Sequence, residues 1–502
     1  MLFNSAAFLF AFLPVTLAGY FLVLRFLGKL PSQLWLFLAS LFFYGWWNPK
    51  YVALIIGSML FNYYLGRYLL LNQDRKALIL GIAANLAVLG YYKYTGLLVA
   101  TTNQLTGADF IVPNIILPLG ISFFTFQKIA FLVDCHRKLA APNQSLINFG
   151  LFITFFPQLI AGPIVHHKEM MPQFAKPRSF DPGSFAVGLT LLSIGLFKKV
   201  MIADTLDAYV GPLFKAAESR PLHIIEAWAA ALAYTFQIYF DFSGYSDMAL
   251  GLGKMFNVRL PVNFFSPYKA KNIIDFWRRW HMTLSRFLRD YLYIPLGGNR
   301  KGNARRYLNL MITMLLGGFW HGANWTFLVW GGLHGAFLGI NHAWQQAGMP
   351  RLPGPLAAAL TFLCVMIAWI FFRAGDLHTA VSITGSLVDF SSMKGQGLYD
   401  ALLSRRAVLR SSFDAPDANF FCILIPLAAA ICWVLPNSIE IMRRGSPCIG
   451  STRGLPLASN KLARALSWQP GLATGLLGGV ILSICIAKVV YEPSQVFLYF
   501  QF

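Results

Sequence analysis

Three histidines stand close to tryptophans in the sequence, two of them in a mostly apolar stretch and one in a basic segment. His281 follows Trp277–Trp280, His321 follows Gly317–Trp320, and His334 comes later in the same apolar run. Near pH 7 a neutral imidazole can take the proton of a hydroxyl that attacks an acyl carbon. No Cys, Asp or Glu completes a metal-ligand set around these histidines, so we expect no metal site. Catalysis fits His321 best, and a structural histidine bonded across helices is the alternative, which suits His334.

The position of His321 along the chain predicts that it lies deep in a membrane. It comes fifteen residues after Arg306, so an unbroken helix would carry it about 22 Å into the bilayer at ~1.5 Å per residue. An ionisable side chain at that depth is costly and usually marks a pathway or a site. The glycines beside it would allow close approach of a backbone or a substrate. We expect Trp320 and Asn324 to form a partly polar wall there, and the role of His334 stays open.

The segment 254–306 contains twelve Lys and Arg residues and only two acids. If residues 272–300 form one helix, Trp277 and Trp280 begin an apolar stripe on which His281 also lies. Arg278 and Arg279 then fall to the sides of the stripe. This composition predicts a helix lying at the cytoplasmic interface of a membrane. His281 is either a hydrogen-bonded structural residue or a functional one.

A third polar patch interrupts the apolar run between residues 237 and 251. It contains Asp241, Ser243, Tyr245 and Asp247. Carboxylates inside a membrane that have no obvious partner are expected to face a water-filled cavity. They could equally pair with basic groups of the segment 254–306. We therefore regard these four residues as candidate cavity lining.

The composition of the whole chain indicates an all-α, polytopic membrane protein. Of its 502 residues 57% are hydrophobic and only 12% are charged, and the mean hydropathy is +0.56. Apolar runs near the ~20 residues that cross a bilayer recur throughout. The clearest are Phe8–Leu24, Ala77–Leu98, Ile111–Val133, Phe420–Leu435 and Gly471–Val490. The formal net charge of +21 would suggest nucleic acid in a soluble protein, but here it is explained by cytoplasmic loops, so we expect no nucleic-acid partner.

The distribution of Lys and Arg orients the chain in the membrane. The basic stretches 72–76, 135–138, 166–178, 254–306 and 437–468 should be cytoplasmic. The nearly balanced stretch 374–418 is the best candidate for a large external loop, and the last run then leads residues 497–502 to the extracytoplasmic side. Roughly 10 to 13 spans fit this single domain of residues 1–502. The Gly- and Pro-broken run FFPQLIAGPIVHH predicts a re-entrant or tilted segment.

Three stretches together resemble the membrane-bound O-acyltransferase (MBOAT) superfamily: DFWRRWHMTLSRFLRDYLYIPLGGNR, GGFWHGANWTFLVWGGLHG and YFDFSGYSDMALG. The PLGGNR continuation and the opening MLFNSAAFLFAFLPV are similar to its alginate-acetylating branch. The resemblance implies a ring of helices, thinned around a central tunnel, with His321 as the essential histidine and His281 as the second one. It also implies acetyl-CoA as the cytoplasmic donor and an extracytoplasmic, alginate-like polysaccharide as the acceptor, in a bacterial inner membrane.

The final residues FLYFQF are similar to the terminal motif of a small partner in the related teichoic-acid D-alanylation system. That likeness implies that Tyr499 carries the acyl group to a secreted or membrane-anchored transferase of the SGNH type. An interfacial aromatic belt in the lipid bilayer is the alternative for this tail. Alternatives for the whole chain are a transporter or flippase for a polysaccharide precursor, and acylation of peptidoglycan or cellulose.

Overall fold

The computed structural model describes residues 1–141, 145–393, 418–449, 461–492 and 495–498. Within these ranges the regular elements are helices, and a single isolated β-bridge joins Pro261 to Ile449. The expectation of an all-α fold is confirmed.

The helices of the first half of the chain are the following: η1 (Ala7–Phe12), α1 (Leu13–Phe26), α2 (Lys29–Gly45), α3 (Lys50–Asn72), α4 (Arg75–Thr106), α5 (Ile121–His136), α6 (Leu146–Thr154), α7 (Phe156–Leu159), α8 (His167–Phe174), α9 (Pro182–Leu196), η2 (Phe197–Ala203), α10 (Asp204–Ser219) and α11 (Ile224–Met255).

Those of the second half are η3 (Pro267–Lys269), α12 (Ile273–Trp277), α13 (Met282–Leu288), η4 (Arg289–Tyr293), α14 (Gly302–His321), α15 (Trp325–Gln346), α16 (Gly354–Arg373), α17 (Leu377–Ser386), η5 (Phe390–Met393), α19 (Ala418–Trp433), α20 (Ser438–Ile441), η6 (Arg443–Gly445), α21 (Lys461–Ala465) and α22 (Leu472–Tyr491).

Among the described residues, six helices are long and apolar enough to cross a membrane, which makes the chain a multi-pass membrane protein. They are Ala7–Phe26, Lys50–Asn72, Arg75–Thr106, Pro182–Ser219, Gly354–Arg373 and Leu472–Tyr491. The spans expected at Phe8–Leu24 and Ala77–Leu98 lie within the first and third of these, and the span expected at Gly471–Val490 begins one residue before the last. The apolar run Phe420–Leu435 coincides with α19, a shorter helix of 16 residues.

Two expectations about the elements are wrong in part. The run Ile111–Val133 is not one helix, because residues 109–118 have no regular structure and α5 begins only at Ile121. Pro113 and Pro118 disfavour a helix there, and Gly120 precedes α5 with a φ of +70°, in the left-handed region. The expected loop 374–418 is not all loop either, since α17 forms within it and packs against α10 and α16.

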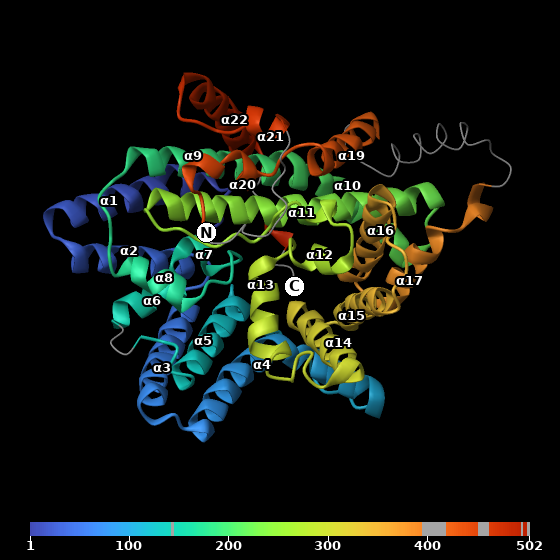
Figure 1. Ribbon diagram of the computed structural model, residues 1–502, viewed down its shortest axis with the longest axis horizontal. Helices are drawn as coiled ribbons and strands as arrows, with labels where there is room; N and C mark the ends of the chain where they lie inside the picture. The colour runs from blue at the N-terminus through green and yellow to red at the C-terminus, as the bar shows by residue number, and fades with distance from the viewer. Residues whose placement is uncertain (142–144, 394–417, 450–460, 493–494, 499–502) are drawn as a thin grey trace.

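Helix α11 is the long central element, and it crosses the middle of the molecule with α9 beside it (Figure 1). From Tyr234 to Met255 every residue of α11 is buried. Glycines allow the two backbones to approach closely: a Cβ on Gly195 would lie 2.6 Å from the carbonyl oxygen of Gly244, and one on Gly188 would lie 2.6 Å from that of Gly251. Small residues at such crossings are the usual means of tight helix packing in membranes.

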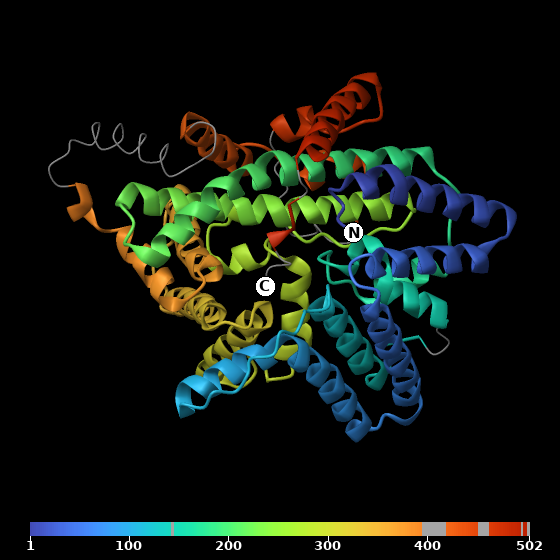
Figure 2. The same ribbon diagram turned by 180° about the vertical axis from the view of Figure 1, so that it is seen from behind.

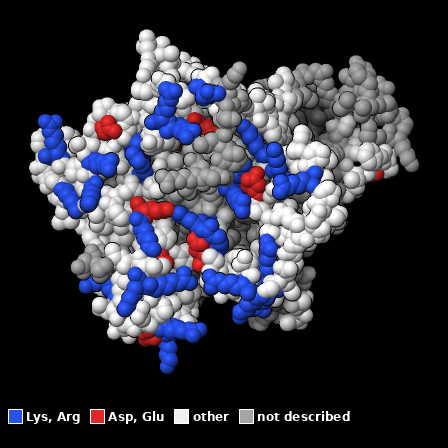
Figure 3. Space-filling model, viewed as in Figure 1, with Lys and Arg blue, Asp and Glu red and all other residues white. Residues whose placement is uncertain are grey.

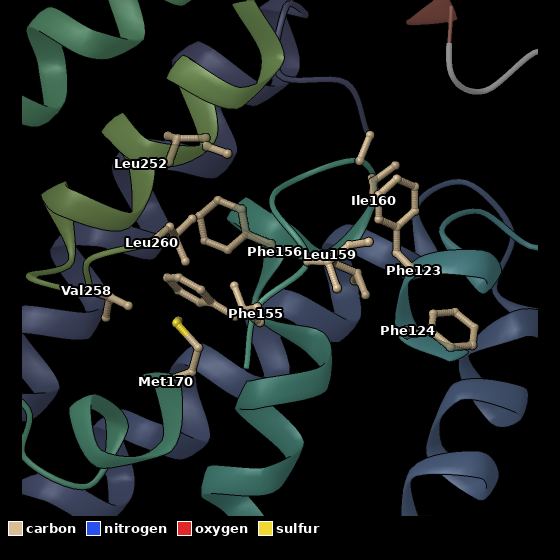
Figure 4. Packing of buried hydrophobic residues seen from close by; sticks show 14 of the residues in the cluster. Phe123, Phe124, Phe155, Phe156, Leu159, Ile160, Met170, Leu252, Val258 and Leu260 are labelled. Carbon is tan, nitrogen blue, oxygen red and sulfur yellow. The ribbon is translucent and has the colours of Figure 1, made fainter. Parts of the chain in front are cut away.

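The broken run Phe155–His167 is an irregular buried segment, as its glycines and prolines predict. Before α8 begins at His167, only the four residues of α7 are helical, and residues 155–165 are all buried. Phe155 and Phe156 pack toward Val258 and Leu260, on the chain that leaves α11 (Figure 4). Backbone without regular structure is tolerated at membrane depth where protein surrounds it.

The apolar core consists of two clusters that meet near the centre of the molecule. The first, cluster A, is built mainly by η1 and α1–α9 together with parts of α11 and α13, and it includes Phe123 and Trp320. The second, cluster B, is built mainly by α10–α12 and α14–α17, and it includes Trp280, Trp330 and Phe372. We call the boundary between them the seam. Helix α4 passes beside α14 (Figure 2).

Candidate functional site

The segment 254–306 does not form one long interface helix. It breaks into α12, a turn, α13 and the π-helical η4. The break falls at His281, whose φ of +41° and ψ of +52° lie in the left-handed region that side chains rarely adopt. Such strain costs ~1–3 kcal/mol and is concentrated at functional sites. The expected apolar stripe does not form along one helix, but Trp277 and Trp280 are both buried in cluster B.

Contacts with a distant loop hold the strained turn in place. The backbone N–H of Met282 donates to the carbonyl oxygen of Asn263 at 2.9 Å, and Phe265 N–H donates to Arg279 O at 2.9 Å. The side-chain oxygen of Asn263 also accepts a hydrogen bond from the Thr283 hydroxyl at 2.8 Å. These bonds tie the residues on both sides of His281 to one loop.

The same asparagine orients the His281 ring. His281 Nδ1 lies 3.0 Å from Asn263 Oδ1. Because an amide oxygen can only accept, Nδ1 carries the proton and donates it, so the Nε2 of a neutral ring keeps its lone pair. His281 is almost fully buried, at 1% exposure. The arrangement therefore presents a basic nitrogen from a fixed ring.

His321 is the last residue of α14, so the unbroken helix expected from Arg306 to His321 is confirmed. Its neighbours in the chain allow α14 to approach α15 closely. A Cβ on Gly318 would collide with the carbonyl oxygen of Phe327, and one on Gly322 would collide with the Phe327 ring. These glycines therefore allow the close approach that was expected, and the groups that come close are the backbone and the ring of Phe327.

Two side chains of α4 bind the end of α14 that carries His321. Lys93 Nζ donates to the carbonyl oxygens of Trp320 at 2.6 Å and of His321 at 2.7 Å. The hydroxyl of Tyr94 donates to Phe319 O at 2.8 Å, and its ring stacks on that of Phe319 with centroids 4.2 Å apart. The final carbonyl groups of a helix have no partner within the helix, and a cation near them also complements the helix dipole.

Both histidines lie at the seam. His321 contacts Trp320 of cluster A, with ring centroids 4.8 Å apart, and Trp330 of cluster B, with centroids 5.0 Å apart. The His281 ring meets Phe242 of cluster B at 4.8 Å and lies 6.5 Å from Phe123 of cluster A. The Phe123 ring also meets that of Trp320 edge to face, with centroids 5.6 Å apart, so it joins the surroundings of the two histidines. The structure therefore brings together the two histidines that are far apart in the sequence.

His334 is completely buried beside the same aromatic rings, but its contacts are those of a packing residue. Its Nδ1 accepts a hydrogen bond from Trp277 Nε1 at 3.2 Å. This bond joins α15 to α12. A structural histidine bonded across helices, the alternative that suited this residue, describes the contact.

A cavity of about 770 Å³ lies next to His281. Trp277 borders it on one side of the turn, and Met282 and Thr283 border it on the other. Its charged lining is formed by four guanidinium groups, one imidazole and one carboxylate: Arg278, Arg286, Arg289, Arg306, His342 and Glu169. We call it the basic pocket. Lys and Arg also gather over the face of the molecule seen in Figure 3.

The charge of the basic pocket comes mainly from its arginines. Glu169 is paired with Arg286, with Nη1 and Oε1 2.6 Å apart. Burial, with Arg306 and Arg278 nearby, lowers the pKa of His342 at the end of α15. A neutral His342 then accepts from Arg306 through its Nδ1. The guanidinium groups are suited to bidentate contacts with phosphate oxygens.

Of the other residues expected to line the site, some line the basic pocket, and the rest pack or form hydrogen bonds within the protein. Trp277 and Arg278 line the pocket, whereas Arg279 is buried and paired with Asp275, with Nε and Oδ1 2.9 Å apart. Trp320 packs against Phe126 at 4.9 Å near His321. Asn324 caps α15 by accepting from Thr326 N–H, and it donates to Gly375 O at 2.6 Å.

The carboxylates of α11 have partners that the sequence analysis did not identify. Asp241 lies 2.6 Å from Lys199 Nζ, and Asp247 lies 2.6 Å from Lys198 Nζ. The Ser438 hydroxyl also donates to Asp247 at 2.9 Å. Both lysines come from η2 and not from the segment 254–306, so the expected pairing with that segment is wrong. The sequence did contain a sign of this pairing, because two lysines interrupt the apolar run LFKKVMIA and would need carboxylate partners.

The other two candidates on α11 are deeply packed. Ser243 is 2% exposed, and so is Tyr245, whose ring stacks on that of Phe3 with centroids 4.9 Å apart. Tyr499 lies outside the described residues, which end at Leu498 in this part of the chain.

One group of side chains within the described ranges has the composition of a metal site. The Nε2 atoms of His166 and His167 lie 2.8 and 2.9 Å from the same oxygen of Asp134, and the Tyr291 hydroxyl donates to that oxygen at 3.0 Å. His166 Nδ1 accepts from Lys168 N–H at 3.4 Å, so the proton of a neutral His166 is on Nε2, facing Asp134. A hydrogen-bonded network that joins α5, α8 and η4 explains the group, and the absence of a metal remains a prediction.

Comparison with known proteins gives these residues a context. The sequence model of a family described as MBOAT, membrane-bound O-acyltransferase family, matches residues 17–372. A peptidoglycan O-acetyltransferase of Helicobacter pylori is 46% identical over 428 residues, which cover 78% of this chain and 81% of that protein. A probable alginate O-acetylase AlgI of Pseudomonas aeruginosa is 39% identical, with 100% of both chains covered. A teichoic acid D-alanyltransferase of Streptococcus thermophilus is 27% identical over 51% of this chain and 68% of its own.

Proposed function

Because this chain belongs to the membrane-bound O-acyltransferase family, we propose that it passes an acetyl group from cytoplasmic acetyl-CoA across a bacterial inner membrane for O-acetylation of an extracytoplasmic polysaccharide. The observation that carries the proposal is the position of His321. It is buried at the end of α14, at the seam with His281, and the basic pocket begins beside that second histidine.

The basic pocket is the proposed entry of the donor. Coenzyme A carries several phosphate charges, which four arginines attract at short range and contact through paired N–H groups. Its thioester would reach past Trp277 and Thr283 toward the histidines. Aromatic rings around the histidines would limit the access of water, and hence the hydrolysis of the thioester.

The proposed chemistry is one acyl transfer with a balanced proton path. An acceptor hydroxyl gives its proton to a ring nitrogen of His321 while its oxygen attacks the thioester carbon. The C–O bond forms, the C–S bond breaks, and the proton passes to the departing thiolate, so that coenzyme A leaves as the thiol. His281 stands beside this step with a lone pair on Nε2, positioned by Asn263.

The proposed acceptor is the hydroxyl of Tyr499, at the extracytoplasmic side. A phenol has a pKa of about 10, so its ester is more activated than a sugar ester and onward transfer is downhill. An SGNH-type partner, secreted or membrane-anchored, would take the acetyl group from the tyrosine and place it on the polysaccharide. The likeness of residues 497–502 to the D-alanylation motif supports this step.

Two acceptors are supported by relatives. The AlgI relative covers the whole chain, which favours an alginate-like polysaccharide. The 46% identity to a peptidoglycan O-acetyltransferase favours peptidoglycan as the second candidate. Deleting the gene and measuring ester-linked acetate on exopolysaccharide and on peptidoglycan separately decides between them.

The test of the proposal is replacement of the two reacting groups. His321→Ala should abolish release of the coenzyme A thiol from acetyl-CoA by the protein in liposomes, whereas His378→Ala, at an exposed histidine of α17, should leave it unchanged. Mass spectrometry after incubation with acetyl-CoA should show one acetyl group on Tyr499 and none in Tyr499→Phe. Retained activity in His321→Ala would contradict the catalytic assignment, and unchanged polysaccharide acetylation in Tyr499→Phe would exclude the carrier.

A further inference from the structure

Residues 495–498 form the tail segment, and its last two side chains are buried although the segment follows α22, most of whose residues are exposed. Phe497 is 2% exposed and Leu498 is 5% exposed. The segment lies beside α11 in both ribbon views (Figures 1 and 2). Phe497 belongs to cluster A and Leu498 to cluster B, so the tail segment enters the seam that also holds the two histidines.

Two buried, oppositely charged side chains hold the main chain of the tail segment. The backbone N–H of Leu498 donates to Asp241 Oδ2 at 3.1 Å. The carbonyl oxygen of Val496 accepts from Lys199 Nζ at 3.4 Å. Lys199 and Asp241 also bind each other, and Asp204 lies 2.7 Å from the same ammonium group. A donor and an acceptor are thus presented to the main chain on the two sides of Phe497.

An aromatic contact fixes the register of the segment. The Phe497 ring meets that of Tyr245 edge to face, with centroids 4.4 Å apart. Lys199 Nζ lies 4.6 Å from the centre of the Phe497 ring, within the range of a cation–π contact. Because Phe497 is held in this contact, the carbonyl group before it and the N–H group after it are the ones that reach Lys199 and Asp241.

We propose that Lys199, Asp241 and Tyr245 form a receptor for a peptide segment with a Phe–Leu pair, and that its occupant is this chain's own tail segment. The receptor holds Leu498 at the seam, the boundary between the two clusters at which His281 and His321 also lie. The purpose of this receptor rests on the proposed function, whereas the binding of the tail segment to it does not depend on acetyl transfer.

The receptor gives the polar residues of α11 a role other than lining a water-filled cavity. Asp241 is held by lysine on one oxygen and by the tail segment on the other. A carboxylate that accepts a backbone N–H recognises main chain, and the aromatic contact adds the preference for phenylalanine. The ligand class is therefore an aromatic peptide segment and not a lipid or a sugar.

The experiment measures seating and acetylation in the same samples. Leu498→Cys is introduced into the full-length protein, and the rate at which a water-soluble maleimide labels position 498 is read from the tail peptide by mass spectrometry. Phe497→Ala removes the aromatic contact and leaves the Lys199–Asp241 pair intact, so the labelling rate should rise about tenfold as the segment opens. Val496→Ala is the matched control, because its side chain is 37% exposed and only its main chain is held.

A second variant tests the receptor from the other side. Asp241→Asn keeps the size of the side chain but weakens the bonds to Leu498 and Lys199, and it should also raise labelling about tenfold, provided that the protein elutes as a folded species. Equal labelling in the parent, Phe497→Ala and Asp241→Asn proteins would overturn the receptor. Protected labelling in the parent with no acetyl group on Tyr499 in the protein that retains Leu498 would leave the receptor standing and reject the carrier.

Discussion

Lys93 offers the sharpest test of how the scaffold positions His321. Its ammonium group donates to the carbonyl oxygens of Trp320 and His321, at 2.6 and 2.7 Å. Lys93→Met keeps most of the side chain's length and removes both bonds. A hydrogen bond to a charged group contributes about 1.5–3 kcal/mol. Because Lys93 is only half-buried, we take the low end for each bond, which gives about 3 kcal/mol for the end of α14.

This loss translates into an expected change in rate. About 3 kcal/mol corresponds to about a hundredfold change at ~1.4 kcal/mol per tenfold, so kcat should fall by up to about a hundredfold as the end of α14 leaves its native position. The KM for acetyl-CoA should stay the same, because Lys93 does not line the basic pocket. Tyr94→Phe removes one bond between neutral groups, about 1 kcal/mol, and should cost about fivefold.

The assay is release of the coenzyme A thiol from acetyl-CoA by purified protein in liposomes. Lys128→Met serves as the matched control, because Lys128 is a buried lysine of α5 that binds Ser58 and not the end of α14. Lys93→Arg keeps the positive charge and should recover part of the rate. A folded Lys93→Met protein with the parent kcat would refute the reasoning, as would an equal loss in Lys128→Met.

Three further outcomes are expected. Arg306→Gln should weaken acetyl-CoA binding about tenfold at low salt and less at high salt, measured by titration, because exposed charge contacts are screened; equal loss at both salt concentrations would contradict this. Asn263→Leu should lower kcat more than thermal stability, whereas Asn263→Asp, which keeps an oxygen acceptor for His281, should retain more activity. Gly318→Ala should reduce the yield of folded protein, seen by size-exclusion chromatography, because its Cβ would collide with Phe327 O; a normal yield would show that α14 and α15 can separate.

The sequence predicted best what depends on local composition. The run after Arg306 predicted an uninterrupted helix that reaches His321, and α14 is such a helix. The irregular course of residues 155–165 follows from the clustering of helix breakers, because Pro157, Gly162 and Pro163 fall within a short run. In both cases the determining residues are neighbours in the chain.

What depends on distant partners was not predictable in the same way. The turn at His281 is held by Asn263 and Phe265, which belong to a loop that packs on the turn only in the folded chain. Nothing in the local pattern distinguishes it from a helix, because the left-handed residue is a histidine and not a glycine. The partner of Asp241 lies 42 residues away, and Lys93 is more than 220 residues away from the helix end that it binds.

The paired charges between η2 and α11 have a consequence for how the protein enters the membrane. Lys198 and Lys199 are part of the span Pro182–Ser219, which the ribosome completes before it makes Asp241 and Asp247. Each unpaired lysine at the centre of a bilayer costs about 2.5–3.5 kcal/mol on the insertion scale. Helix α11 is not one of the six helices apolar enough to cross by composition. The two segments therefore help each other to insert. A chain truncated before α11 would leave Lys198 without its carboxylate and Lys199 with Asp204 alone, and it should be retained poorly in the membrane.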